Sequence, residues 1–218
     1  MKLLKKLIIA LAVMAVPFSL TANDGWYTTV GAGMSIAGKS NANQADGPTK
    51  YTLSSKKGYN GGIALGYYFT PSFRVEAQVS YLNNNLKDVK EDGNSVIGTA
   101  KFDGQLNSWS TMANAYYDID LDSVVKPYVG FGLGLANTKT KIEGTFSGTA
   151  FEIKKSKSSL AYQGIVGTKY EINEDASLSL EYRYFKANSY KIAEKNSTND
   201  YKIDYARHLI VLGLTFGF

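Results

Sequence analysis

The last fifteen residues, 204–218, alternate between bulky apolar and small or polar side chains. Phe218, Phe216, Leu214, Leu212 and Ile210 share one register. The other register holds Gly217, Thr215, Gly213, Val211, Leu209, Arg207 and Tyr205. This period of two predicts a β-strand. Because chain ends usually fray into water, two phenylalanines at the terminus favour a strand whose apolar face meets lipid.

The same alternation recurs seven times upstream. The segments are 26–36, 59–69, 73–81, 107–119, 129–136, 160–172 and 177–184. With the terminal segment they give eight strands of about ten residues, the length that a tilted strand needs to cross a bilayer.

The connections between these segments alternate strictly between short and long. The short ones are 70–72, 118–124 and 173–175, and the long polar ones are about 38–57, 87–105, 139–157 and 188–203. Short periplasmic turns and long outer loops are typical of membrane barrels. Lipid also requires a closed sheet, because an open edge would leave backbone groups without partners. The predicted fold is all-β, an eight-stranded antiparallel up-and-down transmembrane β-barrel, with both termini periplasmic.

The N-terminus predicts export. Lys2, Lys5 and Lys6 precede an apolar run from 7 to 16, and a small residue, Ala22, closes the segment. These are the three parts of a secretory signal peptide, which we place at 1–22. The signal would remove three of the 24 basic residues and none of the 19 acidic ones, leaving a net charge of +2. This charge gives little support to nucleic-acid binding.

Residues 23–218 resemble the eight-stranded OmpA/OmpX-like outer-membrane barrels and the related opacity-type surface antigens. The signal, strand count, loop asymmetry and terminal Phe218 carry the resemblance. It implies a bacterial outer-membrane surface protein, non-enzymatic and monomeric, whose loops serve adhesion or surface recognition. It also implies that Phe218 belongs to the insertion signal read by the barrel assembly machinery. The expected partners are outer-membrane lipid, lipopolysaccharide and a host or surface ligand at the loops.

Charged residues fall in the inward register of several segments. They are Arg74, Glu76, Lys169, Glu171, Glu181, Arg183 and Arg207. One interpretation is an ion path or an acid/base pair. The other, which we favour, is a structural ion-pair network, because side chains can fill an eight-stranded barrel and buried charge must be paired.

Two other functions are compatible with the pattern. One is a narrow pore for small solutes, which needs an open lumen. The other is a barrel enzyme acting on lipid A, resembling the deacylases that use an outward His-x-Ser pair. Here the lone histidine begins His208-Leu209-Ile210, so isoleucine holds the nucleophile position. We therefore expect no catalytic, metal or cofactor site; cysteine is absent from the sequence.

The loops 38–57 and 139–157 each carry a charge of +3 by residue count, so a basic rim could contact lipopolysaccharide phosphates or anionic polymers. Solvated lysines explain the same charge. Segment 139–157 also alternates around Ser147-Gly148, which predicts two strands continuing past the membrane to a hairpin.

Overall fold

The computed structural model describes residues 25–36, 39–44, 50–55, 57–91, 94–95, 102–146, 149–193 and 200–218. The predicted signal peptide at 1–22 lies outside these residues. Every regular element in the described ranges is a strand. The strands are β1 (Trp26–Ile36), β2 (Lys39–Gln44), β3 (Lys50–Ser55), β4 (Gly58–Thr70), β5 (Phe73–Glu91), β6 (Asn94–Ser95), β7 (Phe102–Asp118), β8 (Val125–Phe146), β9 (Thr149–Glu171), β10 (Ala176–Ala193) and β11 (Asp200–Gly217). No helix in the described part of the chain is long and apolar enough to span a membrane.

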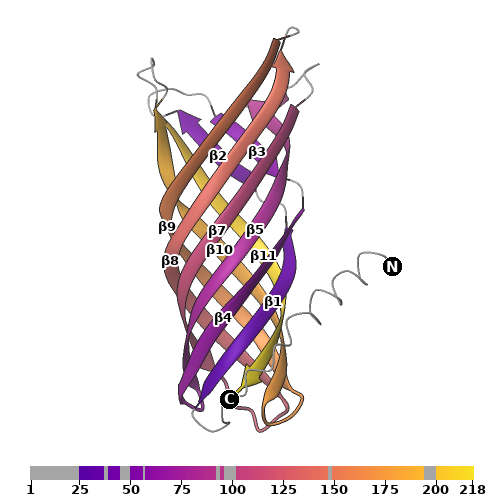
Figure 1. Ribbon diagram of the computed structural model, residues 1–218, viewed down its shortest axis with the longest axis vertical. Coiled ribbons are helices and arrows are strands. Elements are labelled where there is room, and N and C mark those ends of the chain that lie inside the picture. Colours follow the sequence, from indigo (N-terminus) through magenta and orange to yellow (C-terminus); the bar gives the residue numbers. More distant parts are fainter. Residues whose placement is uncertain are drawn as a thin grey trace, which may run out of the picture.

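Eight of these strands close into one antiparallel barrel. Neighbours along the chain pair in the order β1, β4, β5, β7, β8, β9, β10 and β11. The barrel closes where β1 pairs with β11, from Tyr27 opposite Gly217 to Ile36 opposite His208. Figure 1 shows the tilted strands wrapping around one axis. The predicted eight-stranded antiparallel barrel is confirmed.

Short turns and both ends of the barrel chain lie together at one end. Pro71 follows β4, and the hydroxyl of Thr70 accepts the backbone N–H of Phe73 at 3.0 Å. The side chain of Asn173 accepts the backbone N–H of Ala176 at 2.7 Å in the turn before β10. Turn residues that bond their own backbone in this way stabilise a tight reversal. The backbone N–H of Phe218 donates to the carbonyl of Trp26 at 3.0 Å, beside these turns (Figure 1).

At the opposite end the strands continue into the four segments predicted as loops. β8 and β9 pair as far as Phe146 opposite Thr149. A small hairpin of β2 and β3 fills the first segment and pairs with β11 on one side and β5 on the other. The strands of the barrel therefore extend further at this end than the eight predicted strand segments indicated.

Candidate functional site in the barrel lumen

Arg74 on β5 lies at the centre of the charged side chains inside the barrel. Its Nε donates to both carboxylate oxygens of Asp118 at 3.2 Å. Its Nη1 donates to the hydroxyl of Tyr27 at 3.0 Å and lies 3.7 Å from Glu76 Oε2. All four residues are buried. Because a buried charge is costly unless it is paired and hydrogen-bonded, these contacts are what the fold needs to hold Arg74 there.

Four tyrosine rings surround the guanidinium group of Arg74. Its central carbon lies 4.0 Å from the ring centroid of Tyr116 and 4.8 Å from that of Tyr128. The centroids of Tyr27 and Tyr68 lie at 5.7 and 5.9 Å. Such cation–π contacts stabilise a desolvated cation by about 2 kcal/mol or more. The aromatic shell also fills the lumen around the charge.

Glycines on the inner face make room for three of these rings, including that of Tyr116 beside Gly130. A Cβ at Gly66 would overlap the ring of Tyr27, and one at Gly167 would overlap the ring of Tyr128. Glycine in a strand commonly marks a close approach of this kind. The small residues of the inward register are therefore matched to the large ones.

A second group of charges stands next to the first. Glu181 and Arg183, two residues apart on β10, share the inward face and form a buried ion pair and hydrogen bond. The hydroxyl of Tyr128 donates to Glu181 Oε1 at 2.6 Å. The hydroxyl of Tyr116 donates to Glu76 Oε1 at 3.2 Å. Tyrosines thus link the carboxylates of β5 and β10 to strands β7 and β8.

Amide side chains connect across the same level of the lumen. Gln163 Nε2 donates to Gln78 Oε1 at 3.1 Å and to Asn114 Oδ1 at 2.7 Å. Asn114 Nδ2 donates to Gln78 at 3.2 Å and to Glu76 at 3.3 Å. These bonds tie β5, β7 and β9 together across the interior, which leaves little space for solute.

Lys169 and Glu171 lie nearer the short-turn end. Lys169 Nζ donates to the Tyr68 hydroxyl at 2.9 Å and to Asp118 Oδ2 at 3.1 Å. Glu171 is more exposed and pairs with Lys126 at 3.1 Å and with Lys169 at 3.8 Å. The network therefore runs from the middle of the barrel to its short-turn rim.

Asp118 is the buried charged member of this network that the sequence did not predict. The turn was expected to begin at residue 118, whereas β7 ends there and the Asp118 carboxylate points inward and is buried. A signal was present, because Asn114, Tyr116 and Asp118 share one register. The alternation simply continues one residue further than a turn-forming aspartate indicates.

Arg207 lies apart from the other predicted lumen charges. It is opposite Phe185 in the β10–β11 ladder, is 1% exposed, and donates from Nη1 to the carbonyl of Ala206 at 2.7 Å. Apolar side chains occupy this part of the lumen. The buried cluster contains Leu82, Leu106, Met112, Ala136, Ala161, Phe185, Ala187, Leu209 and Val211.

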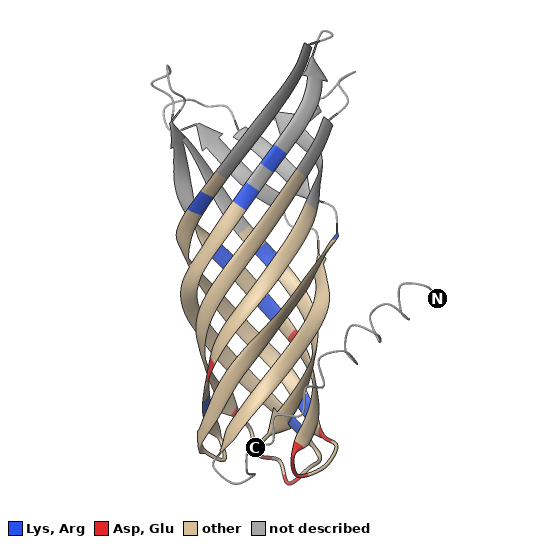
Figure 2. Ribbon diagram, in the orientation of Figure 1, with Lys and Arg blue, Asp and Glu red and all other residues tan. Residues whose placement is uncertain are grey.

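The space left in the middle of the lumen is small, whereas a recess of about 820 Å³ opens at the short-turn rim beside Tyr27, Lys169 and Glu171. A cavity of about 30 Å³ lies between the polar and apolar layers, lined in part by Thr29, Asn60 and Gln78. Another, of about 10 Å³, lies beside Arg74. These small cavities hold on the order of one or two water molecules each. Figure 2 shows the few charged positions within the described barrel wall.

His208 lies on the outer surface, away from this network. Its Nδ1 is 2.6 Å from the Tyr182 hydroxyl, and its ring centroid is 5.3 Å from that of Tyr184. Among the described residues, no group of three or more His, Asp or Glu side chains is arranged to hold a metal ion. The geometry around His208 is that of an aromatic cluster at the barrel surface.

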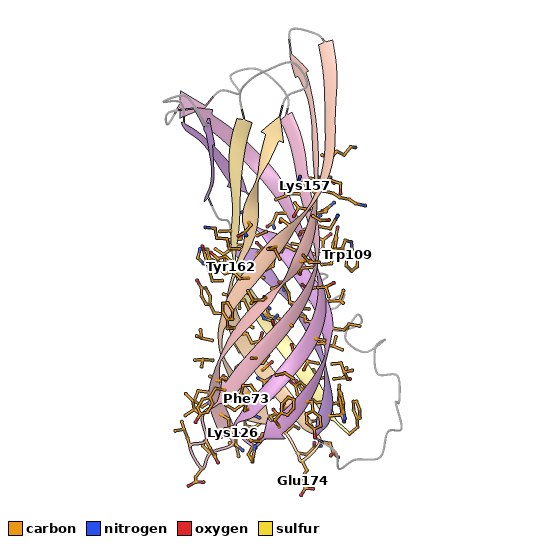
Figure 3. The ribbon with its side chains drawn as sticks, turned by 90° about the vertical axis from the view of Figure 1, so that its left-hand side faces the viewer. Phe73, Trp109, Lys126, Lys157, Tyr162 and Glu174 are labelled. Atoms are coloured by element: carbon orange, nitrogen blue, oxygen red, sulfur yellow. The ribbon has the colours of Figure 1, made fainter. Side chains whose placement is uncertain are left out.

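The outward register is apolar between two aromatic zones. Val129, Phe131, Leu133 and Leu135 of β8 are each about half exposed or more. Near the short-turn end, Phe69 contacts Tyr67 and Phe73 at centroid distances of 5.1 and 6.1 Å. Toward the other end, Tyr81 contacts Trp109 at 5.0 Å. Figure 3 shows Phe73 at one level and Trp109 and Tyr162 at the other.

A closed sheet with an apolar outer band between two aromatic girdles and a polar, filled interior defines a transmembrane β-barrel. The chain belongs to the family described as "Outer membrane protein beta-barrel domain", which matches residues 7–218. It is therefore a protein of the bacterial outer membrane.

Two similar proteins align with almost the whole chain. "Outer membrane protein PagN" of Salmonella typhimurium is 24% identical over 94% of this chain and 95% of its own length. "Putative adhesin RC1281" of Rickettsia conorii is 29% identical over 91% of this chain and 84% of its own length. Among solved structures, the outer membrane protein OprG from Pseudomonas aeruginosa aligns with a TM-score of 0.59 at 17% identity. That alignment covers 90% of this chain and 97% of OprG, and it supports the fold alone.

Proposed function

We propose that this chain is a non-enzymatic surface protein that uses the prolonged, outward-projecting end of its barrel for adhesion or surface recognition. The observation that carries the proposal is the height of the wall beyond the second aromatic girdle. Asn137 is opposite Trp109 of this girdle, and β8 continues from Asn137 to Phe146 in pairing with β9. At about 3.3 Å per residue this adds roughly 30 Å of strand. A structure that only had to seal the membrane would not need this length.

The wall also divides at this end. In the described residues, the β9–β10 ladder ends at Ala161 opposite Ala187, and the β5–β7 ladder ends at Leu86 opposite Gly104. Beyond these points β7, β8 and β9 form one sheet, while β10, β11, β2, β3 and β5 form another (Figure 1). Projecting sheets offer faces and edges on which a partner can be recognised.

The relatives favour the same function. Of the two relatives named above, the one from Rickettsia conorii carries the word adhesin in its description, and the one from Salmonella typhimurium is described as an outer membrane protein. A shared barrel with variable projecting segments is the usual way to change recognition while keeping the scaffold.

Two properties of the lumen and surface support a non-enzymatic role. The charged groups inside are engaged with one another, so we propose that Arg74, Glu76, Lys169, Glu171, Glu181 and Arg183 form a structural network, with Arg207 sealing the outer part. His208 faces outward and is engaged by tyrosines. The filled lumen also argues against the narrow pore.

We further propose that the short-turn end is periplasmic, that the barrel is monomeric, and that residues 1–22 act as the export signal. Phe218 is proposed to be part of the segment that the barrel assembly machinery reads. Loops outside the membrane, including 38–57 and 87–105, would then face the medium.

A shortened hairpin tests the adhesion proposal. Thr140 and Lys155 are opposite each other in the β8–β9 ladder, so residues 141–154 can be replaced by Asn-Gly, a turn that closes antiparallel strands. Bacteria expressing the shortened protein should lose attachment to cultured epithelial cells relative to bacteria expressing the full chain.

The control replaces Glu174 in a turn at the other end with Gln, which should leave attachment unchanged. Both variants must reach the membrane as folded barrels, as judged by heat-dependent electrophoretic mobility. Undiminished attachment by the folded hairpin variant, or no attachment by the full chain, would contradict the adhesion role.

A further inference from the structure

The outward face of β7, β8 and β9 changes from apolar to polar at one level. Leu135 and Leu160 are opposite each other and are 58% and 64% exposed. The next row toward the projecting end contains Trp109, Asn137 and Ser158, and the row after that contains Asn107, Lys139 and Ser156. The lipid-facing register thus passes through an aromatic girdle into a group of hydrogen-bonding side chains.

These polar side chains are organised rather than scattered. Asn137 Nδ2 donates to Ser158 Oγ at 2.9 Å, and Ser156 Oγ donates to Asn137 Oδ1 at 3.2 Å. Asn107 accepts a hydrogen bond from Asn83 on the neighbouring strand β5. These hydrogen bonds therefore fix the positions of polar side chains on both sides of Lys139 in the sheet.

Lys139 is the positive charge of this surface. It is exposed, and its cross-strand neighbours are Asn107 and Ser156, both uncharged. Within the described residues, no carboxylate forms an ion pair with Lys139. By contrast, Lys126, at the other end of the same strand, pairs with Glu171 at 3.1 Å. An external anion would therefore find Lys139 available and neighbouring hydroxyl and amide groups beside it.

The height of Lys139 in the membrane indicates which anion. The apolar stretch of β8 from Val125 to Leu135 spans about 25 Å along the membrane normal at a tilt of about 40°, which matches the apolar band of such barrels. Lys139 lies four residues beyond Leu135, or about 10 Å higher by the same measure. With the short turns in the periplasm, as proposed above, that level is the headgroup region of the outer leaflet. Basic side chains at such a level bind anionic lipid headgroups.

We propose that Asn107, Asn137, Lys139, Ser156 and Ser158 form a binding site for the phosphate group of a phosphorylated glycolipid of the outer leaflet. The acyl chains would lie along Leu135, Leu160 and the neighbouring apolar surface, and the phosphate would reach Lys139. The site is on the side wall, so it goes beyond the proposed recognition function; it rests only on the proposed orientation, in which the short turns are periplasmic.

The experiment measures lipid retention by the folded full-length barrel. The purified protein is incubated with bisphosphorylated lipid A or with chemically dephosphorylated lipid A, and bound lipid is counted by native mass spectrometry after detergent exchange. We expect the phosphorylated lipid to be retained at least tenfold better. Lys139→Gln should abolish this preference, Lys139→Arg should keep it, and Lys126→Gln should have no effect.

Three outcomes would overturn the site. The first is equal retention of both lipids by the unaltered protein, which would mean that only acyl chains are bound. The second is a folded Lys139→Gln variant that keeps the full preference. The third is complete displacement by millimolar inorganic phosphate, which would identify a free-anion site instead of a lipid site. Folding of each variant is verified by heat-dependent electrophoretic mobility.

Discussion

Asp118 accepts hydrogen bonds from the guanidinium of Arg74 through both of its carboxylate oxygens, each at 3.2 Å. The same carboxylate accepts from Lys169, which lies on β9. One side chain at the end of β7 therefore joins neighbouring and more distant strands across the lumen. Its burial means that the two cations depend on it for charge balance.

Replacing Asp118 with Asn should strongly destabilise the barrel. The amide has the same shape but leaves Arg74 and Lys169 without their shared negative charge. Breaking a buried pair by removing one partner costs about 3–5 kcal/mol, so we expect the free energy of unfolding to fall by about that amount. The measurement is urea unfolding in detergent micelles, followed by tryptophan fluorescence. The exposed Glu174→Gln is the control, with an expected change within about 0.5 kcal/mol. A stable Asp118→Asn protein would show that the ion pairs do not hold the lumen together.

Inward and outward glycines should differ in their tolerance of alanine. A methyl group at Gly66 would overlap the buried ring of Tyr27, whereas nothing lies within 4 Å of the corresponding position at Gly164. Overpacking of this kind typically costs about 1–3 kcal/mol. Gly66→Ala should lower the free energy of unfolding by that amount, and Gly164→Ala should change it little. Equal effects in the same urea titration would mean that the rings can move aside and that the lumen is loosely filled.

The sequence predicted the barrel well because membrane strands follow a simple period. Every strand buries one face in the lumen and exposes the other to lipid, so a register assigned at Phe218 extends through Leu212 and Ile210 without tertiary information. The alternation of short and long connections then fixed which ends lie together. Inward charges such as Arg74 and Glu181 follow from the same parity.

The alternation of inward and outward residues could not reveal which inward side chains contact one another. Arg74, Asp118 and Lys169 come together through barrel curvature and strand stagger, which no local pattern encodes. Nor could it predict the apolar layer, because Leu82 and Phe185 each stand next to a residue of the aromatic girdle, and two adjacent bulky residues obscure the alternation. Strand extension beyond the membrane was also underestimated outside 139–157, because polar strands resemble loops by composition.

The filled lumen should prevent steady ion conduction. The polar network and the apolar cluster leave cavities of about 30 and 10 Å³ in the middle of the described barrel, although a recess of about 820 Å³ opens at the short-turn rim. The narrow middle section interrupts a continuous water path. Purified protein in planar lipid bilayers should therefore show no stable channels of porin size. The control is a general porin reconstituted in the same bilayers. Large, steady and weakly selective conductance from the pure protein would favour the pore interpretation.

Proteolysis of intact cells should distinguish the two ends of the barrel. Segments 38–57, 87–105, 139–157 and 188–203 should contain the cleavage sites of added protease, because they lie at the end opposite the short turns. The turn at 173–175 should be protected by the envelope and become cleavable only after the outer membrane is opened. Mass spectrometry of the released peptides identifies the sites. Cleavage at 173–175 in sealed cells would reverse the proposed orientation.

Phe218 should matter more for assembly in cells than for the stability of the finished barrel. Burying one apolar side chain contributes about 1.5–3 kcal/mol, and Phe218 and Phe216 lie in the same outward register. In the barrel, the backbone N–H of Phe218 bonds to Trp26, a contact that a side-chain change would leave in place. Phe218→Ser and Phe216→Ser should therefore cost similar free energies of unfolding after refolding in detergent. If Phe218 is also read during insertion, Phe218→Ser alone should sharply reduce the folded protein recovered from outer membranes. Equal and mild losses in cells for both variants would mean that Phe218 serves only as a lipid contact.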